Sequence, residues 1–271
     1  MKQKRYTLYG FLAVFIWSTG SALCRTLTES WGIAAGALCN LVAGVIAIFY
    51  QYRRCKFAFI KGRSLRFWIT CGILYVTYVV TNYASSIFAV DRQQIMALTL
   101  IKSAWPVLAY VFLFILEKRR PTSRFWCKVG LLTIGLLVSN LIDENGRLYP
   151  MDSFLSCLPA ILIGLASSVA WALYSNALGR FSGGSKGDAG GLFMISASLI
   201  VSGTAVFEKG TYTYALTPSF LIQFLFNSVV SVFIANILWN LAVVKGDRAK
   251  VFSFSNLLPV LSVGMSSLIL G

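Results

Sequence analysis

Long apolar runs dominate this chain and leave few alternatives for its fold. Of its 271 residues, 57% are hydrophobic and 12% are charged, whereas about a quarter of a soluble domain is charged. The runs are long enough to cross about 30 Å of hydrocarbon as helices. We therefore predict an all-α polytopic membrane protein. Nine spans are expected, near residues 6–24, 33–50, 67–90, 93–116, 125–142, 154–178, 189–207, 219–244 and 251–270.

The net charge of +15 bears on membrane topology and does not indicate a nucleic-acid partner, because the basic residues form short clusters between the apolar runs. When the loops are assigned alternately to two sides, 19 lysines and arginines fall on the side of the N-terminus and 4 on the other. The positive-inside rule then predicts a cytoplasmic N-terminus. The first run contains the polar stretch "WSTGS" and no small-x-small cleavage site, so we interpret it as an uncleaved span.

The residues needed for metal or catalytic chemistry are scarce. There is no histidine, and the six cysteines are scattered without CxxC spacing, so we expect no metal site, cofactor or disulfide framework. A membrane-embedded enzyme would need facing nucleophiles, metal ligands or a carboxylate pair within its spans. None is evident in the sequence, and we predict that the protein is not an enzyme.

Two sequence matches indicate an internal repeat. Gly10 and Trp17 recur 154 residues later, in "GLASSVAWALYSNALGR", and "WPVL" at 105–108 recurs 153 residues later as "LPVL". The repeat begins again at the sixth span, so each unit holds five helices and the second unit enters the membrane inverted. Inverted repeats are typical of secondary transporters.

This repeat divides the chain into two units. Residues 1–145 form the first, with spans 1 to 5, and residues 154–271 form the second, with spans 6 to 9. A tenth helix is expected after "SSLILG", so the sequence holds nine spans of an expected ten.

Polar and aromatic residues at helical spacing mark one face of several spans. Pro106 and Pro259 each remove an intrahelical hydrogen bond and free a carbonyl group, which in a bilayer requires a partner from protein or a wet cavity. We predict that these faces line one central cavity. They comprise Thr99, Lys102, Ser103 and Pro106; Phe252, Ser255, Asn256 and Pro259; Tyr75, Tyr78 and Asn82; Trp171, Tyr174 and Ser175; and Asn236, Trp239 and Asn240.

Tryptophan and glycine also have common structural roles in membrane proteins. Tryptophans near span ends commonly anchor the chain at the membrane interface, and we assign this role to Trp31, Trp68 and Trp126. Trp105, Trp171 and Trp239 lie deeper, where an indole N–H needs a partner, and we expect them in the cavity. Glycines such as those at positions 10, 44 and 164 are expected to permit close helix packing.

Lys102 is the one basic residue expected near the bilayer midplane. It lies nine residues after Gln93, about 14 Å along the helix, and no carboxylate lies within a span core. A lysine there costs at least about 2.5–3.5 kcal/mol, which favours a functional role over a neutral or hydrated side chain without a task. Because no span carries a carboxylate, either Lys102 titrates during transport or the protein is a facilitator.

Four motifs give the chain a resemblance to a known family. "GFLAVFIWSTGSALCR", "SAWPVL", "AWALYSNALGRF" and "LWNLAVVKGDRAKVFSFSNLLPVLS" resemble the aromatic amino acid exporters of the drug/metabolite transporter superfamily, whose halves are EamA-type repeats. The resemblance covers spans 1 to 9. It implies a ten-helix carrier that exports amino acids or other metabolites across the plasma membrane.

The resemblance also implies a substrate site. Its matching positions are Trp17, Tyr78, Trp105, Trp171, Tyr174, Trp239, Asn240 and Ser255. The chain departs from the family at Val79, where exporters often carry a polar or acidic residue, and at Lys102, where they tend to carry asparagine. Both departures favour an anionic or carboxylate-bearing substrate and disfavour recognition of a free amino group.

We therefore expect export of aromatic or bulky apolar amino acids, by alternating access about Pro106 and Pro259. Lys102 would bind the substrate carboxylate, the tryptophans its apolar part, and Asn240 and Ser255 would donate hydrogen bonds. The alternative is export of organic anions or drug-like metabolites on the same scaffold. The expected partners are a small-molecule substrate and the lipid bilayer, and the sequence predicts no particular oligomeric state.

Overall fold

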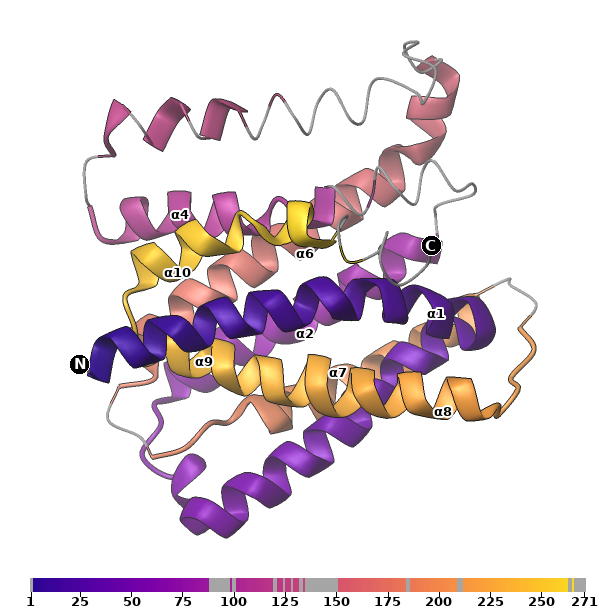
Figure 1. Cartoon of the computed structure of the whole chain (residues 1–271), viewed down its shortest axis with the longest axis horizontal. Helices are drawn as coiled ribbons and strands as arrows, with labels where there is room; N and C mark the ends of the chain where they lie inside the picture. The colour runs from indigo at the N-terminus through magenta and orange to yellow at the C-terminus, as the bar shows by residue number, and fades with distance from the viewer. Residues whose placement is uncertain are drawn as a thin grey trace.

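The protein is a bundle of helices (Figure 1). The computed structural model describes residues 2–87, 98, 101–118, 121–123, 125–127, 129–131, 134, 151–183, 186–208, 212–262 and 265. These residues are helical apart from short connections and include no β-strand, which confirms the predicted all-α class. Among them, four helices are long and apolar enough to cross a membrane: Ser30–Phe59, Leu65–Ser85, Leu158–Phe181 and Pro218–Lys245.

The helices follow the apolar runs closely where the structure describes them. They are α1 (Lys2–Cys55), η1 (Lys56–Phe59), α2 (Leu65–Ile87), α4 (Trp105–Leu116), α6 (Met151–Phe181), α7 (Gly190–Thr204), η2 (Ala205–Phe207), α8 (Pro218–Leu225), η3 (Phe226–Ile234), α9 (Ala235–Lys245) and α10 (Arg248–Ser255). Most of the expected span at 125–142 lies outside the described residues, as does Thr99.

The helix α1 consists of two arms that meet at Gly32, between the expected first and second spans. Gly32 has φ 58° and ψ −148°, a conformation essentially restricted to glycine. The second arm begins at Ile33, whose N–H donates to Glu208 at 2.9 Å. Tyr212 O–H donates to the same carboxylate at 2.6 Å. Because a carboxylate is favourable at a helix N-terminus, Glu208 stabilises the break.

Two helices are interrupted next to the matching prolines. Turns at residues 103–104 and 256–257 precede helical segments that contain Pro106 and Pro259, and the two turns are separated by 153 residues. The carbonyl freed by Pro106 belongs to Lys102, and the Ser168 hydroxyl lies 2.8 Å from that oxygen. The partner predicted for this carbonyl is therefore a side chain of α6.

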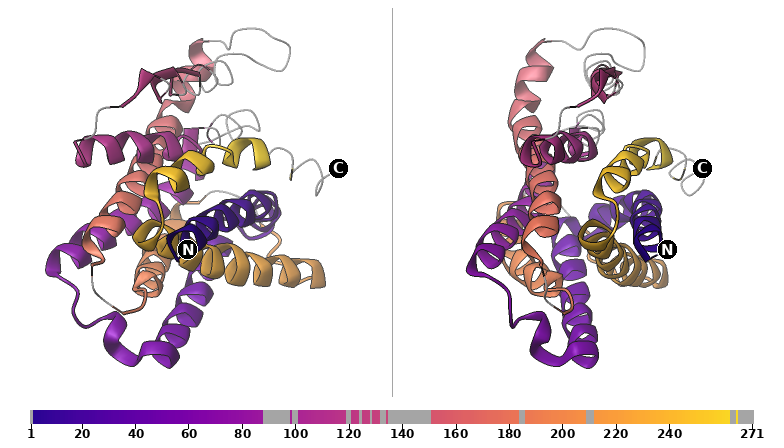
Figure 2. Two further views of the ribbon diagram at one scale, coloured as in Figure 1. Left: turned by 60° about the vertical axis from the view of Figure 1, so that its left-hand side comes forward. Right: turned by 90° about the vertical axis from the view of Figure 1, so that its left-hand side faces the viewer.

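Small residues bring the helices together. The first arm of α1 lies with α9 and α10, next to a group formed by α2, α4 and α6 (Figure 2). The second arm packs on α7, where a Cβ atom added to Gly44 would lie 2.9 Å from the Gly191 carbonyl oxygen. An added Cβ at Gly10 or Gly164 would also approach a neighbouring side chain to below 3.0 Å. These glycines serve the close helix packing expected of them.

The loops meet at two ends of the bundle. At one end, Tyr214 N–H donates to Ser30 O at 3.3 Å, close to the break in α1. At the other end, Arg63 donates to Gly187 O at 2.8 Å, and Lys245 lines the same cavity as Arg63. Segments that the charge pattern assigns to one side of the membrane thus lie at one end. We call the end that holds Arg63 and Lys245 the basic end.

Candidate functional site

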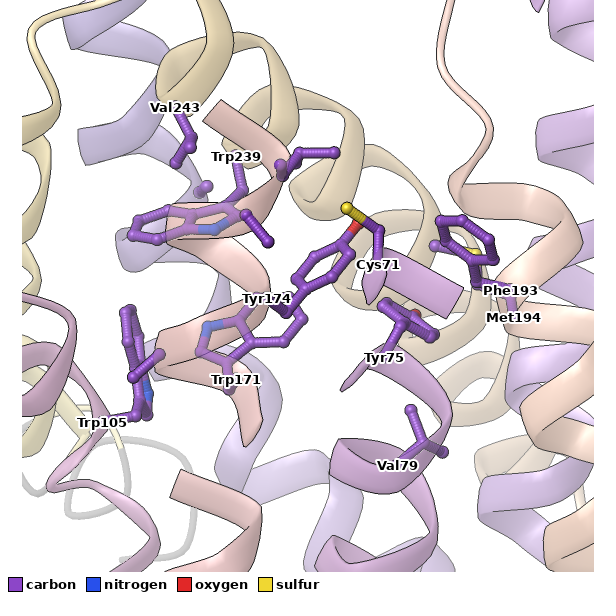
Figure 3. Close-up of a cluster of buried hydrophobic side chains, with 14 of the residues drawn as sticks. Cys71, Tyr75, Val79, Trp105, Trp171, Tyr174, Phe193, Met194, Trp239 and Val243 are labelled. Atoms are coloured by element: carbon purple, nitrogen blue, oxygen red, sulfur yellow. The ribbon is translucent and has the colours of Figure 1, made fainter. Parts of the chain in front are cut away.

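Four tryptophans from four helices meet at the centre of the bundle. This tryptophan cluster consists of Trp17 on α1, Trp105 on α4, Trp171 on α6 and Trp239 on α9. The ring centroid of Trp17 lies 6.2, 5.6 and 5.3 Å from those of Trp105, Trp171 and Trp239. The centroids of Trp105 and Trp239 are 5.1 Å apart (Figure 3). Residues that the sequence separates by more than 200 positions therefore share one site.

Hydrogen bonds to polar groups fix two of these indoles. Trp239 Nε1 donates to Ser175 Oγ at 3.1 Å, and Trp17 Nε1 donates to the Ser231 carbonyl at 3.0 Å. Ser231 lies in η3, a π-helical segment between α8 and α9. Segments of this kind are frequent at functional sites. A local irregularity of the helix thus supplies the partner that a buried indole N–H needs.

The predicted tyrosines extend the cluster. Tyr78 packs on Trp171 with a centroid distance of 4.5 Å, and Tyr174 lies 5.2 Å from the same ring. Tyr75 contacts Tyr174 from the other side, as Figure 3 shows. All the aromatic residues predicted for the site are therefore brought together, and they pack directly on one another in this conformation.

Two predicted polar residues interact with backbone groups of the bundle. Lys102 Nζ donates to the carbonyl of Asn82 on α2 at 2.5 Å. Ser255 is fully buried, and its hydroxyl donates to Phe252 O at 2.9 Å within α10. Lys102 adjoins the break before Pro106, and its carbonyl contacts Ser168, three residues before Trp171. It therefore lies on one side of the tryptophan cluster.

A polar cavity lies on the opposite side of the tryptophan cluster, at the basic end. It encloses about 340 Å³, within the usual range for small-molecule sites. Leu178 lines it two turns of α6 beyond Trp171, and Asn240 lines it next to Trp239. The other lining residues are Gln51, Arg54, Cys55, Arg63, Ser182, Lys186, Gly187, Asp188, Ile237, Leu241, Val244 and Lys245.

Asp188 connects this cavity to the tryptophan cluster through hydrogen bonds. Its Oδ2 accepts from Asn240 Nδ2 at 2.9 Å, and its Oδ1 accepts from the N–H of Gly190 at 3.0 Å. Asn240 Oδ1 in turn lies 3.5 Å from the Tyr174 hydroxyl. Asn240 was predicted from the sequence, whereas Asp188 was not. The signal that could have revealed Asp188 is its place two residues before Gly190, at the start of α7, where a carboxylate can accept backbone N–H groups.

Arg63 is the second residue that the sequence did not single out. It lies in the connection before α2, and its guanidinium carbon is 4.2 Å from the ring centroid of Phe67. Its Nε donates to Phe59 O at 2.8 Å and its Nη2 to Gly187 O at 2.8 Å. Burial lowers the pKa of Arg63, and the negative charge of Asp188 opposes this effect. The side chain stays charged at neutral pH.

The carboxylate of Asp188 has a raised pKa. Burial is the largest cause, and it outweighs the hydrogen bonds from Asn240 and Gly190 and the charge of Arg63. The folded protein therefore binds this proton more tightly than the unfolded chain does. The resulting contribution to stability is complete below about pH 3.8, the ordinary value, and is lost as the pH rises through the folded pKa.

The expected result is that the stability of Asp188→Asn relative to the wild type increases as the pH is raised, on top of a pH-independent loss of one hydrogen bond to Asn240 or Gly190. The variant keeps the shape of the side chain and removes a poorly solvated charge. Thermal unfolding in detergent at several values between about pH 4 and about pH 8 measures the difference. Asp247→Asn is the control, because Asp247 pairs with the exposed Lys250 at 3.4 Å. A difference between Asp188→Asn and wild type that does not grow with pH would contradict the assignment.

Comparisons with known proteins place this geometry in context. The chain is 25% identical over its whole length to the aromatic amino acid exporter YddG of Salmonella typhimurium, covering 90% of that protein. It is 22% identical to the YddG of Escherichia coli, with the same coverage. The chain resembles the aromatic amino acid exporters throughout. The resemblance drawn from its four motifs is thus confirmed, and both of these relatives are named as exporters.

The fold has a counterpart among solved structures. One crystal structure matches 99% of this chain and 88% of its own, with a TM-score of 0.76 and 19% sequence identity. At this identity the match concerns the fold alone. No protein-family model matches the chain.

Proposed function

We propose that this protein is a secondary transporter that exports aromatic or bulky apolar amino acids across the plasma membrane. The observation that carries the proposal is the convergence of four tryptophans at the bundle centre, in a chain similar over its whole length to two exporters. Indole rings offer large apolar faces to an aromatic side chain. An aliphatic or small polar substrate would use less of this surface.

In the proposed mechanism, the tryptophan cluster opens alternately toward the two membrane faces. The breaks before Pro106 and Pro259 are the hinges, because a helix interrupted there bends with little loss of hydrogen bonding. The 153-residue separation of the breaks supports an inverted repeat of five-helix units, 1–145 and 154–271. In the open states, the four indoles and Tyr78 would contact the side chain of the substrate. Lys102 would bind its carboxylate, and Tyr174, Asn240 and Ser255 would contribute polar contacts.

Transport by purified protein in liposomes tests this function. We expect efflux of radiolabelled phenylalanine and tryptophan to exceed that of serine and glutamate, and to saturate. Liposomes without protein are the control. Equal efflux of all four amino acids, or none above the control, would contradict the proposal.

Export of organic anions is the second candidate. It is favoured by the four basic side chains of the polar cavity, which come from Arg54, Arg63, Lys186 and Lys245. The same liposomes distinguish the two functions. A preference for 3-phenylpropionate over phenylalanine would favour organic anions, and the reverse preference would favour amino acids.

The membrane orientation is a further prediction, with the basic end facing the cytoplasm. In a cysteine-free background, a cysteine replacing Tyr214 should react from outside intact cells with a thiol reagent that cannot cross membranes. A cysteine replacing Lys61 should react only after permeabilisation. Both positions are exposed and lie in loops at opposite ends. The reverse labelling pattern would overturn the predicted orientation.

A further inference from the structure

The polar cavity at the basic end holds a guanidinium group with an unused hydrogen-bond donor. Arg63 is fixed by the carbonyls of Phe59 and Gly187 and by the ring of Phe67. Its Nη1 atom is shielded from solvent and has no hydrogen-bond partner among the described residues. A buried donor without a partner is costly, and such groups are rare unless a water, ion or ligand satisfies them.

The same cavity holds a carboxylate with spare acceptor capacity. Asp188 accepts hydrogen bonds from the amide of Asn240 and from the backbone N–H groups of Gly190 and Ala189, whereas a carboxylate offers about four acceptor positions. Asp188 is among the residues that line the cavity. Among the described residues, neither Arg63 nor Asp188 forms an ion pair.

Two opposite charges thus line one cavity without pairing with each other. The lining of the same cavity is apolar in part, because α6 contributes Leu178 and α9 contributes Ile237, Leu241 and Val244. A ligand that fits this arrangement has an anionic group, a cationic group and an apolar side chain. A free α-amino acid has all three.

We propose that the polar cavity is a loading site for a zwitterionic α-amino acid with an apolar side chain, where Arg63 binds the carboxylate and Asp188 binds the ammonium group. This inference rests on the proposed function and adds a site distinct from the tryptophan cluster. The guanidinium fork matches a carboxylate in geometry and charge. A carboxylate ligand that reached Nη1, after a shift of the groups that shield it from solvent, would supply the partner that this atom lacks.

The position of the site suits the first step of export. Asn240 contacts Asp188 and directly follows Trp239, and its amide oxygen faces the Tyr174 hydroxyl. A ligand that displaces Asn240 from Asp188 therefore changes the hydrogen bonding of the residue that directly follows Trp239. The remaining basic side chains at the cavity, among them Lys186 and Lys245, attract anionic groups from solution.

Cys55 provides a reporter that is specific for this site, because it lines the cavity and is partly exposed. The test uses the full chain with the other five cysteines replaced by alanine, and follows the rate of Cys55 modification by a maleimide. We expect phenylalanine to slow this reaction in a saturable manner. Phenethylamine and 3-phenylpropionate, which each lack one charge, should protect only at higher concentrations.

Charge-removing variants test each half of the assignment. In Arg63→Gln, the concentration of phenylalanine that gives half protection should rise about 10- to 100-fold, while that of phenethylamine stays unchanged. In Asp188→Asn, the same loss should affect phenylalanine and spare 3-phenylpropionate. Arg66→Gln is the matched control, because Arg66 is exposed and lies outside the cavity lining. Because each variant keeps one ligand, a loss of folding cannot imitate the expected pattern.

The outcomes separate this inference from the proposed function. Phenylalanine transport in liposomes without any protection of Cys55 would overturn the loading site and leave the transport function intact. Protection with the expected variant pattern, but no transport, would support the site and overturn the function. If both variants weaken all three ligands equally, or none, the roles given to Arg63 and Asp188 are wrong.

Discussion

Replacing Gly32 with alanine is expected to destabilise the protein by about 2–6 kcal/mol, because backbone strain and overpacking each contribute about 1–3 kcal/mol. The residue has a positive φ of 58°. An added Cβ atom would also lie 2.5 Å from Glu208 Oε2 and 2.7 Å from the Tyr212 ring. The substitution would therefore displace the carboxylate that binds the first N–H of the second arm of α1. Thermal or denaturant unfolding in detergent measures the effect.

Gly62 provides a matched control for this experiment. It also has a positive φ, 81°, but an added Cβ atom there would meet nothing within 4 Å. Gly62→Ala should therefore show the backbone cost alone, about 1 kcal/mol. If Gly32→Ala and Gly62→Ala cost the same, the contacts with Glu208 and Tyr212 do not matter to the break in α1.

Replacing Lys102 with asparagine is expected to change substrate preference while the protein stays folded. The change removes a costly charge from a membrane span and one hydrogen bond to Asn82 O. If Lys102 binds the substrate carboxylate, the variant should transport amino acids about 10- to 100-fold less well, since a charge-assisted hydrogen bond contributes about 1.5–3 kcal/mol. The corresponding amides should be little affected. Competition of acids and amides for labelled phenylalanine in liposomes measures the ratio.

Lys61→Asn is the control for this variant, because Lys61 is exposed in the loop at the basic end. It should leave the ratio of acid to amide transport unchanged. Equal losses of acids and amides in Lys102→Asn would contradict the carboxylate role. Unchanged transport of both would mean that the lysine has a structural role, as a donor to Asn82.

Much of the helical architecture could be predicted from local sequence signals. An apolar run in a bilayer forms a helix because its backbone groups have no other partners. A proline interrupts that helix wherever it falls, and the turns before Pro106 and Pro259 follow from this rule. Deep tryptophans need a partner for the indole N–H, which pointed to Trp171 and Trp239 as interior residues. All these signals depend on one residue and its near neighbours.

The partners of these residues were not predictable in the same way. The Trp17 indole binds the Ser231 carbonyl only because η3 is π-helical, and no sequence pattern indicated that segment. No sequence pattern indicated Ser168 either, whose hydroxyl on α6 donates to the carbonyl of Lys102 on another helix. Each contact depends on how two helices are placed side by side, and small residues such as Gly44 allow many such placements.

The sequence by itself thus determined that the chain forms membrane helices, where they break, and which aromatic residues are internal. Only the tertiary structure decided that Arg63 and Asp188 share a cavity. Hydropathy treats loop charges as solvated, and these two residues lie in loops 125 positions apart. They meet because α1, α6, α7 and α9 end around the same space. Burial of a loop charge depends on all the elements packed around it, and that information is absent from any local stretch of sequence.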